Sequence, residues 1–364
     1  MSSSLGLACG HERLPAPHSA LWISGQGREN AELGLVVAAS TSSRASEYRS
    51  GFRGHDVAID PSRPGRVVLF GRRPGRESIV VDIRQERVEK RLSAHEGHAF
   101  QGHGFFTPDG CWLVAVEADL NSAHGKLVVR DGTQLNIIEV HDTYGLGPHE
   151  AALLPDTQTV VIANGGLLTR AETGREVLNL ATMDSTLVYV HLGSGDLLQM
   201  HRVDEPRASI RHLDILADGT VALGLQIQRA AIGHNAPLPL CGRHRGDEEI
   251  VLFDDRLDVT AALNDYVGSV AVSSAARIAA YSSPRGNLCA AWSIDDGRFI
   301  GMHELYDGCG LAASLDDKNF IFNSSTGEVR TLRVSDLAEI RSARRKLDVQ
   351  WDNHLVIVDA KGWS

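Results

Sequence analysis

The chain has 364 residues, a formal net charge of -10, 36 glycines and 43% hydrophobic residues. The acidic balance disfavours general attraction to nucleic acid or to an anionic membrane surface. No stretch approaches the roughly 20 apolar residues that span a bilayer, and five cysteines without a C-x-x-C pair exclude a zinc knuckle and a thioredoxin-like motif.

The first segment, residues 1–17, has neither the basic start nor the sustained apolar run of a signal peptide. We interpret it as a disordered start or as the remnant of a targeting segment. The remainder, residues 18–364, is expected to form a single domain.

A hairpin pattern then recurs along the chain. Each copy has a short apolar strand, a turn with Pro, Asp or Gly, and a second apolar strand. A further strand pair follows, as in residues 78–92 and 187–203, and the long spacings are explained by an insertion at 167–184 and a loop at 230–248. Four antiparallel strands per unit, repeated in this way, predict a β-propeller. The six copies begin near His55, His103, His149, His212, Ser269 and Cys309.

A seventh unit begins at Trp351 and leaves room for one strand only. Apolar segments at 20–25, 33–40 and 46–52 can supply the missing strands. The sequence therefore predicts an all-β fold, a seven-bladed β-propeller closed by N-terminal strands that pair with the C-terminal strand.

Histidines recur at one position of this repeat. The first strand of each propeller blade lines the central channel, so the starts of these strands gather on one face. Neutral imidazole is a common ligand of iron, copper and zinc, and the histidines at the strand starts are therefore candidate ligands of such a transition metal at the channel mouth. They are His55, His103, His149, His212 and His354.

Arginines and amides are expected on the same face, since the second strands of the hairpins end there. The arginines oppose a cation and suit a carboxylate or a phosphate. Three interpretations remain open: the rings tie neighbouring blades together, they hold a metal or a metal chelate, or the face binds an anion or catalyses a reaction. The candidate ligand-binding residues are Arg53, Arg72, Arg73, Asn164, Arg211, Gln226, Arg285 and Asn323.

Several segments at these positions resemble a known family. Phe52-Arg53-Gly54-His55, Gly147-Pro148-His149-Glu150 and Trp351-Asp352-Asn353-His354 are similar to motifs of the bacterial family called domain of unknown function 1513. The resemblance extends from about Ala20 to His354 and implies a propeller of the YVTN-like or quinoprotein-amine-dehydrogenase-like kind.

The resemblance also carries functional implications. Members are typically exported to the periplasm, often behind a twin-arginine signal, a motif that the first 20 residues here lack. Their genes tend to lie beside those of imelysin-like iron-uptake proteins and di-haem peroxidase-like proteins, which are therefore the partners it implies. A role in iron or other metal handling follows from this association.

These observations favour a monomeric, exported binding protein over an enzyme. One alternative is a metal-dependent, lactonase-like hydrolase, in which Glu117, Asp119 and Glu150 are the candidate acid–base groups. The other alternative is a protein-interaction scaffold, a common use of propellers.

Overall fold

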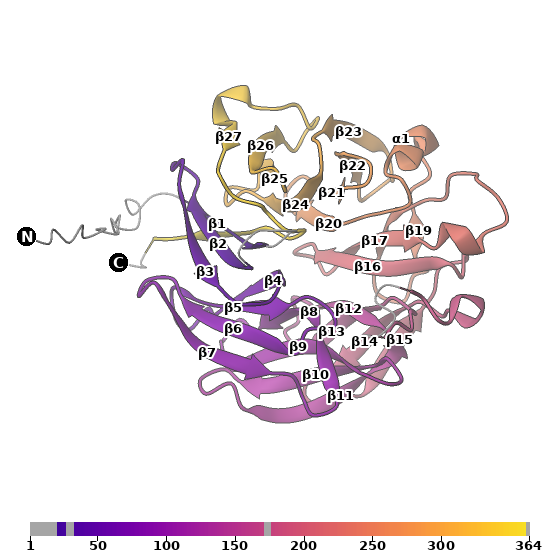
Figure 1. Cartoon of the computed structure of the whole chain (residues 1–364). Helices are drawn as coiled ribbons and strands as arrows, with labels where there is room; N and C mark the ends of the chain where they lie inside the picture. Colours follow the sequence, from indigo (N-terminus) through magenta and orange to yellow (C-terminus); the bar gives the residue numbers. More distant parts are fainter. Residues whose placement is uncertain (1–19, 27–32, 171–175, 362–364) are drawn as a thin grey trace, which may run out of the picture.

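The structure is a computed structural model that describes residues 20–26, 33–170 and 176–361. The segment 1–17, for which the sequence predicts a disordered start or a targeting remnant, lies outside these ranges. Seven four-stranded antiparallel sheets stand around one axis, which confirms the seven-bladed propeller (Figure 1). Among the described residues, no helix is long and apolar enough to cross a membrane.

The blades are numbered here in chain order. Blade 1 contains β4 (Gly54–Ile59), β5 (Arg66–Gly71), β6 (Glu77–Asp82) and β7 (Arg87–Ser93). Blade 2 contains β8 (His98–Phe106), β9 (Trp112–Asp119), β10 (His124–Asp131) and β11 (Ile137–Leu146). Blade 3 contains β12 (Pro148–Leu153), β13 (Thr159–Asn164), β14 (Thr186–His191) and β15 (Leu197–His201).

The next three blades have the same four-strand order. Blade 4 contains β16 (Ala208–Ile215), β17 (Val221–Ile227), β18 (Cys241–His244) and β19 (Val251–Leu252). Blade 5 contains β20 (Ser269–Ser273), β21 (Ile278–Ser283), β22 (Leu288–Ser293) and β23 (Phe299–Glu304). Blade 6 contains β24 (Gly308–Ala313), β25 (Asn319–Ser324), β26 (Glu328–Arg333) and β27 (Arg345–Lys346).

Blade 7 joins the two ends of the chain. The C-terminal strand pairs antiparallel with the first strand, from Ala20 opposite Asp359 to Ile23 opposite Val356. This pairing confirms the predicted closure and leaves the ring without an open sheet edge at the junction. The blade contains β28 (Val356–Asp359), β1 (Ala20–Gln26), β2 (Gly34–Ala39) and β3 (Ala45–Arg49).

Helical structure is confined to the connections between strands. Within the ranges that the structure describes, it consists of the α-helix α1 (Leu257–Ala262) and three 3-10 turns, at Leu180–Thr182, Arg229–Ala231 and Arg341–Ala343.

One segment differs from the sequence-based expectation. The stretch 230–248 reads as a loop because it is rich in Pro, Gly and His, yet it contains β18, the third strand of blade 4. Leu240 and Cys241 are buried in the core shared with blade 5, and the strand pairs with β17. Burial and sheet pairing outweigh the loop-like composition around it.

The hydrophobic core lies between neighbouring blades, where their faces pack. Between blades 4 and 5, for example, Leu223 and Leu225 pack with Tyr281 and Trp292 in one fully buried cluster. Such burial contributes about 25 cal/mol per Å² of apolar surface removed from water. The inner strands β4, β8, β12, β16, β20 and β24 contact one another in turn around the axis, and this ring positions the site.

Candidate functional site

Backbone bulges at the starts of the inner strands direct side chains toward the axis. In blade 1, His55 and Asp56 both lie opposite a single residue of β5, and in blade 3 His149 is the extra residue. Blades 2, 4 and 6 have register shifts at the same place, whereas blade 5 keeps a regular register from Ser269. Bulges of this kind re-aim side chains and are frequent beside functional sites.

Five histidine rings meet inside the channel and form what we call the histidine cluster. Neighbouring ring centroids are 4.6 to 5.9 Å apart, and no ring is more than 8% exposed. The rings are therefore buried in the channel and not spread around its mouth. The cluster consists of His55, His103, His149, His212 and His354.

The ring nitrogens of the cluster lie close enough together for three of them to bind one metal ion. Ligand nitrogens of His55, His103 and His149 lie within 4.8 Å of one another, and so do those of His103, His212 and His354. Each of the five rings has one buried nitrogen without a hydrogen-bond partner among the described residues. A buried polar atom left unpaired costs about 1–3 kcal/mol, so binding a Lewis acid here would relieve several such costs together.

Carboxylates stand behind two of the rings. Nδ1 of His103 lies 3.2 Å from Oδ2 of Asp56, and Nδ1 of His212 lies 3.1 Å from Oε2 of Glu150. In both rings Nε2 is the buried nitrogen without a partner. A carboxylate that accepts from Nδ1–H fixes this tautomer and leaves Nε2 as a basic metal ligand, which is the usual arrangement behind metal-binding histidines.

Four rings of the cluster favour the unprotonated form. Burial is the main cause that lowers the pKa of His55, His149 and His212 well below 6.5, with further lowering by the charges of neighbouring rings and arginines. Burial likewise lowers the pKa of His354 to about 3. Unprotonated imidazole is the form that binds metals.

The two carboxyl groups behind the rings are shifted in opposite directions. Burial is the largest single influence on Asp56 and opposes its ionisation, but the hydrogen bond with His103, the charges of His103 and His354 and a backbone hydrogen bond together outweigh it and lower the pKa of Asp56. Burial, with the charge of Asp56 as the next cause, raises the pKa of Glu150 well above its usual range. The pair therefore resists carrying two negative charges at once.

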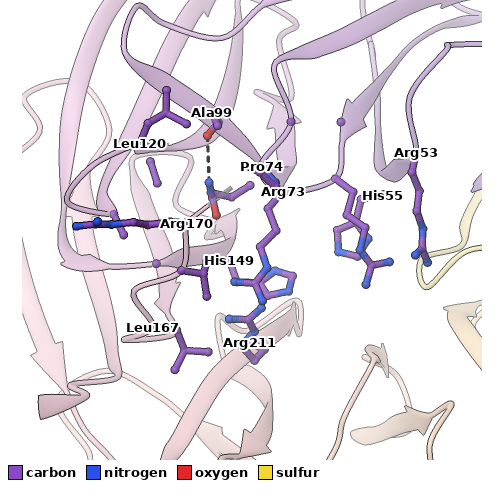
Figure 2. A pocket seen from close by; sticks show the side chains of 18 of the residues that line it. Arg53, His55, Arg73, Pro74, Ala99, Leu120, His149, Leu167, Arg170 and Arg211 are labelled. Carbon is purple, nitrogen blue, oxygen red and sulfur yellow. Dashed lines mark hydrogen bonds between the residues drawn. The ribbon is translucent and has the colours of Figure 1, made fainter. Parts of the chain in front are cut away.

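A cavity of about 600 Å³ opens on the side of the cluster where the inner strands begin (Figure 2). His55 and His149 line it, so the cavity and the cluster share two rings. Glu77 and Asp119 are the acidic residues of its lining. We call it the arginine cavity after the seven arginines that line it, which are Arg53, Arg72, Arg73, Arg76, Arg170, Arg211 and Arg285.

The arginines have unequal surroundings. Buried Asp352 accepts hydrogen bonds from Nε of Arg53 at 2.7 Å and from Nη1 of Arg72 at 3.1 Å, and these charges outweigh burial and lower the pKa of Asp352. Arg211 is only 2% exposed, and its Nε and Nη1 have no partner among the described residues. Burial, followed by the charge of Arg73, lowers the pKa of Arg211. Arg211 thus presents donors to the cavity that have no acceptor among the described residues.

Most of the predicted ligand-binding residues line the arginine cavity. They are Arg53, Arg72, Arg73, Arg211, Gln226 and Arg285.

Asn164 and Asn323 are not in that lining. Nδ2 of Asn164 donates to the carbonyl of Thr143 at 2.7 Å, and Oδ1 of Asn323 accepts from the backbone N–H of Gly310 at 2.9 Å. Both side chains are fully buried. They bind backbone groups inside the sheets, because their side chains turn into the protein where the second strands end.

The three acid–base candidates are dispersed. Glu150 lies against His212, as described above. Asp119 lines the arginine cavity, but its carboxylate accepts from the backbone N–H groups of a turn at Asn121 and Ser122. Glu117 is buried elsewhere, where it accepts from the backbone N–H of His95 and lies 3.6 Å from Arg130.

The sequence interpretation missed several contributors: Asp56, Asp352, Arg76 and Arg170. The sequence does contain an indication that carboxylates belong to the site, because four of the five histidines have an Asp or Glu within two residues in the chain. The pairs are His55–Asp56, His149–Glu150, His212–Asp214 and His354–Asp352. Arg76 and Arg170 lie in loops whose approach to the cavity no strand pattern indicates.

Fold and site together define a seven-bladed propeller with a buried histidine cluster beneath an arginine-lined mouth. Residues 50–358 match the family model described as "Protein of unknown function (DUF1513)", and the chain belongs to this family. No curated protein matches it.

Among solved structures, the fold is similar to a chain of Kuenenia stuttgartiensis hydrazine synthase. The TM-score is 0.61 at 13% identity, over 91% of this chain and 99% of that one. At this identity the likeness shows the propeller fold alone.

Proposed function

We propose that this protein binds a transition-metal ion in the histidine cluster and serves in metal handling as a binding protein. The observation that carries the proposal is the convergence of five buried rings, each with an unpartnered nitrogen. A purely structural role for the rings would predict hydrogen bonds from both nitrogens to neighbouring blades, and these rings do not have them.

His103 is the central ligand in this proposal. It belongs to both candidate sets, and its Nδ1 is engaged by Asp56, so only Nε2 is available. A single available nitrogen favours one ion per chain, held by His103 with either His55 and His149 or His212 and His354. Three protein nitrogens leave coordination positions for an external ligand. The imidazole set suits zinc, copper or iron.

The cellular part of the proposal rests on family membership. We propose that the protein works in the periplasm and that its partners are iron-uptake proteins of the imelysin-like or peroxidase-like kind. Both points can be tested in the native host. Cell fractionation locates the protein, and an antibody raised against the untagged protein captures it together with any bound partners. Recovery in the cytoplasm without such partners would contradict them.

Hydrolysis is supported less well than binding. Glu150 has the raised pKa that a general acid needs, but it lies behind His212 and is not in the lining of the arginine cavity. A substrate in that cavity would meet mainly arginines and imidazoles, and the carboxylate of Asp119 in the lining is already bound by the backbone N–H groups of a turn. We therefore propose a binding role and not a lactonase-like activity.

Metal content tests the proposal directly. Protein purified without a His tag, and analysed for zinc, copper and iron, is expected to retain about one ion per chain, consistent with three-nitrogen sites. After chelation, adding back the retained metal should raise the melting temperature, because a ligand that binds only the folded state stabilises it. No retained metal and no shift with any of the three would overturn the proposal.

Replacing the shared ligand sharpens the test. His103→Gln should weaken metal binding by more than the roughly 10–100-fold that loss of an outer-shell partner costs. The matched control is His124→Gln, at an exposed position on β10. If His103→Gln does not fold, His354→Gln replaces a ligand of only one set and should give a smaller loss with the fold intact.

A further inference from the structure

The arginine cavity is a second binding site, joined to the first. We infer that it binds a small organic polyanion with at least two carboxylate or phosphate groups, and that an oxygen of this anion reaches the metal in the histidine cluster. The second half of the inference rests on the proposed function. The first half, anion binding by the cavity, stands independently of it.

The charge balance of the lining points to an anion. Among the described residues, seven arginines line the cavity and the acidic lining residues are Glu77 and Asp119, while Asp352 behind the lining compensates Arg53 and Arg72 in part. A concave surface with an excess of one sign of charge concentrates counter-ions of the opposite sign. Guanidinium groups bind carboxylate and phosphate through paired hydrogen bonds.

Arg211 provides the second, independent observation. Its guanidinium is buried on the cavity wall with Nε and Nη1 unpartnered, an arrangement that costs free energy until an acceptor binds. The position of Gly165 makes room for it, because a Cβ there would lie 2.7 Å from Nη1 of Arg211. Tyr266 stacks against the guanidinium of Arg285, 4.4 Å from its ring centroid, and positions a second arginine of the lining.

The two sites are contiguous through shared rings. His55 and His149 line the arginine cavity and also belong, with His103, to one of the two candidate metal sets. Figure 2 shows these two rings among Arg53, Arg73 and Arg211. An anion held by the arginines therefore lies beside the coordination positions that three histidines leave open.

The charges also couple the two ligands. The arginines repel a cation at the rings, and a bound polyanion removes this repulsion. By linkage, an anion that strengthens metal binding is itself bound more tightly when the metal is present, by the same factor. We therefore expect the natural ligand to be a metal together with its anionic chelator, or a metal that requires such an anion.

The first experiment tests the cavity without any metal. Succinate and pyrophosphate are titrated into the chelator-treated protein by calorimetry, so that the two probes distinguish carboxylate from phosphate recognition. At least one should bind at a single site, more weakly as salt rises. Arg211→Met should weaken this binding at least tenfold, whereas the control Arg298→Met, at an exposed arginine outside the lining, should not. Absence of binding, or binding by Arg211→Met as tight as by the unchanged protein, would overturn the anion site.

The second experiment tests the link to the metal. The probe that binds in the first experiment is added to the cobalt(II)-loaded protein. The visible absorption spectrum should then change, and this change should be lost in Arg211→Met. An unchanged spectrum at saturating probe would overturn the contact between anion and metal while leaving the anion site in place. Failure of cobalt to bind at all would count against the proposed function, and the metal-free titration would still decide on the cavity.

Discussion

Blades 5 and 6 differ from the rest of the ring at the position that faces the axis. They carry Ser269 and Cys309 where the other five blades have histidine. In blade 6, Sγ of Cys309 donates to Oδ1 of Asn323 at 3.3 Å, and Oγ of Ser282 in blade 5 donates to the carbonyl of Cys309. Cys309 is therefore bound within its own sheet and to Ser282, the residue paired with Ser269, and these bonds tie the two blades together.

The histidines at the equivalent position keep an unpartnered nitrogen instead. A bulge alone does not explain the difference, because blade 6 also has a register shift at the start of its inner strand, as blades 1 to 4 do. The comparison shows that one position of the repeat can cap a blade or contribute to a site, and that polar satisfaction distinguishes the two uses.

Apart from the ligands themselves, the largest effect on metal affinity is expected from the carboxyl groups behind the rings. Asp56→Asn and Glu150→Gln keep the size of each side chain but replace a group that can ionise with a neutral amide, so His103 and His212 become weaker ligands. Each change should lower metal affinity by roughly 10–100-fold. The control Asp296→Asn changes an exposed carboxylate. Competition with a metal-sensitive dye measures the affinity, and equal affinities in all four proteins would place the metal elsewhere.

In blade 6 we expect a smaller effect, and one on folding stability instead of metal affinity. Asn323→Ala removes the acceptor of the buried N–H of Gly310 and should lower the free energy of unfolding by about 1–3 kcal/mol. Metal affinity should stay unchanged, because this blade has a capping role. Urea unfolding and the same dye competition measure the two quantities. A loss of metal binding in a stably folded Asn323→Ala would break the distinction between the blades.

The smallest expected effect is on the pH dependence of the unfolding free energy of the metal-free protein. The pKa of His354 falls from 6.5 to about 3 on folding, so between these values the unfolded chain binds more protons and stability declines as pH falls. His354→Gln should flatten this slope by up to about 1.4 kcal/mol per pH unit, the value of one proton.

Glu150 contributes to the pH dependence of stability with the opposite sign. Its pKa is raised on folding, so its contribution is fully present below 4.5 and is lost as pH rises. Glu150→Gln should therefore make the decline toward low pH steeper. Unfolding free energies measured from about pH 6 to about pH 4 give both slopes. Identical slopes in wild type and both variants would show that these groups do not titrate differently on folding.

The ring of blades was predictable because each repeat unit has a recognisable local sequence pattern. The strand–turn–strand units place His55, His103 and His149 at equivalent starts, and the missing strands of the last unit point to closure by the N-terminus. The bulges were not predictable. They depend on the pairing of two strands, and they decide that His55 and Asp56 both oppose one residue of β5.

The same limit explains the misplaced candidates. Spacing puts Glu117 and Asn164 at the ends of second strands, but their direction depends on neighbours such as Arg130 and Thr143. Arg170 reaches the arginine cavity from a connection between strands, where no periodicity applies. Register can be derived from sequence, whereas side-chain direction at a strand end is set by tertiary contacts.

X-ray absorption spectroscopy of the metal-loaded protein tests the central claim most directly. With zinc or cobalt bound after chelation, the account predicts at least three imidazole nitrogens at about 2.0–2.1 Å from the metal. These signals should diminish in His103→Gln. A shell of oxygen atoms alone, without imidazole scattering, would contradict the histidine cluster as the metal site.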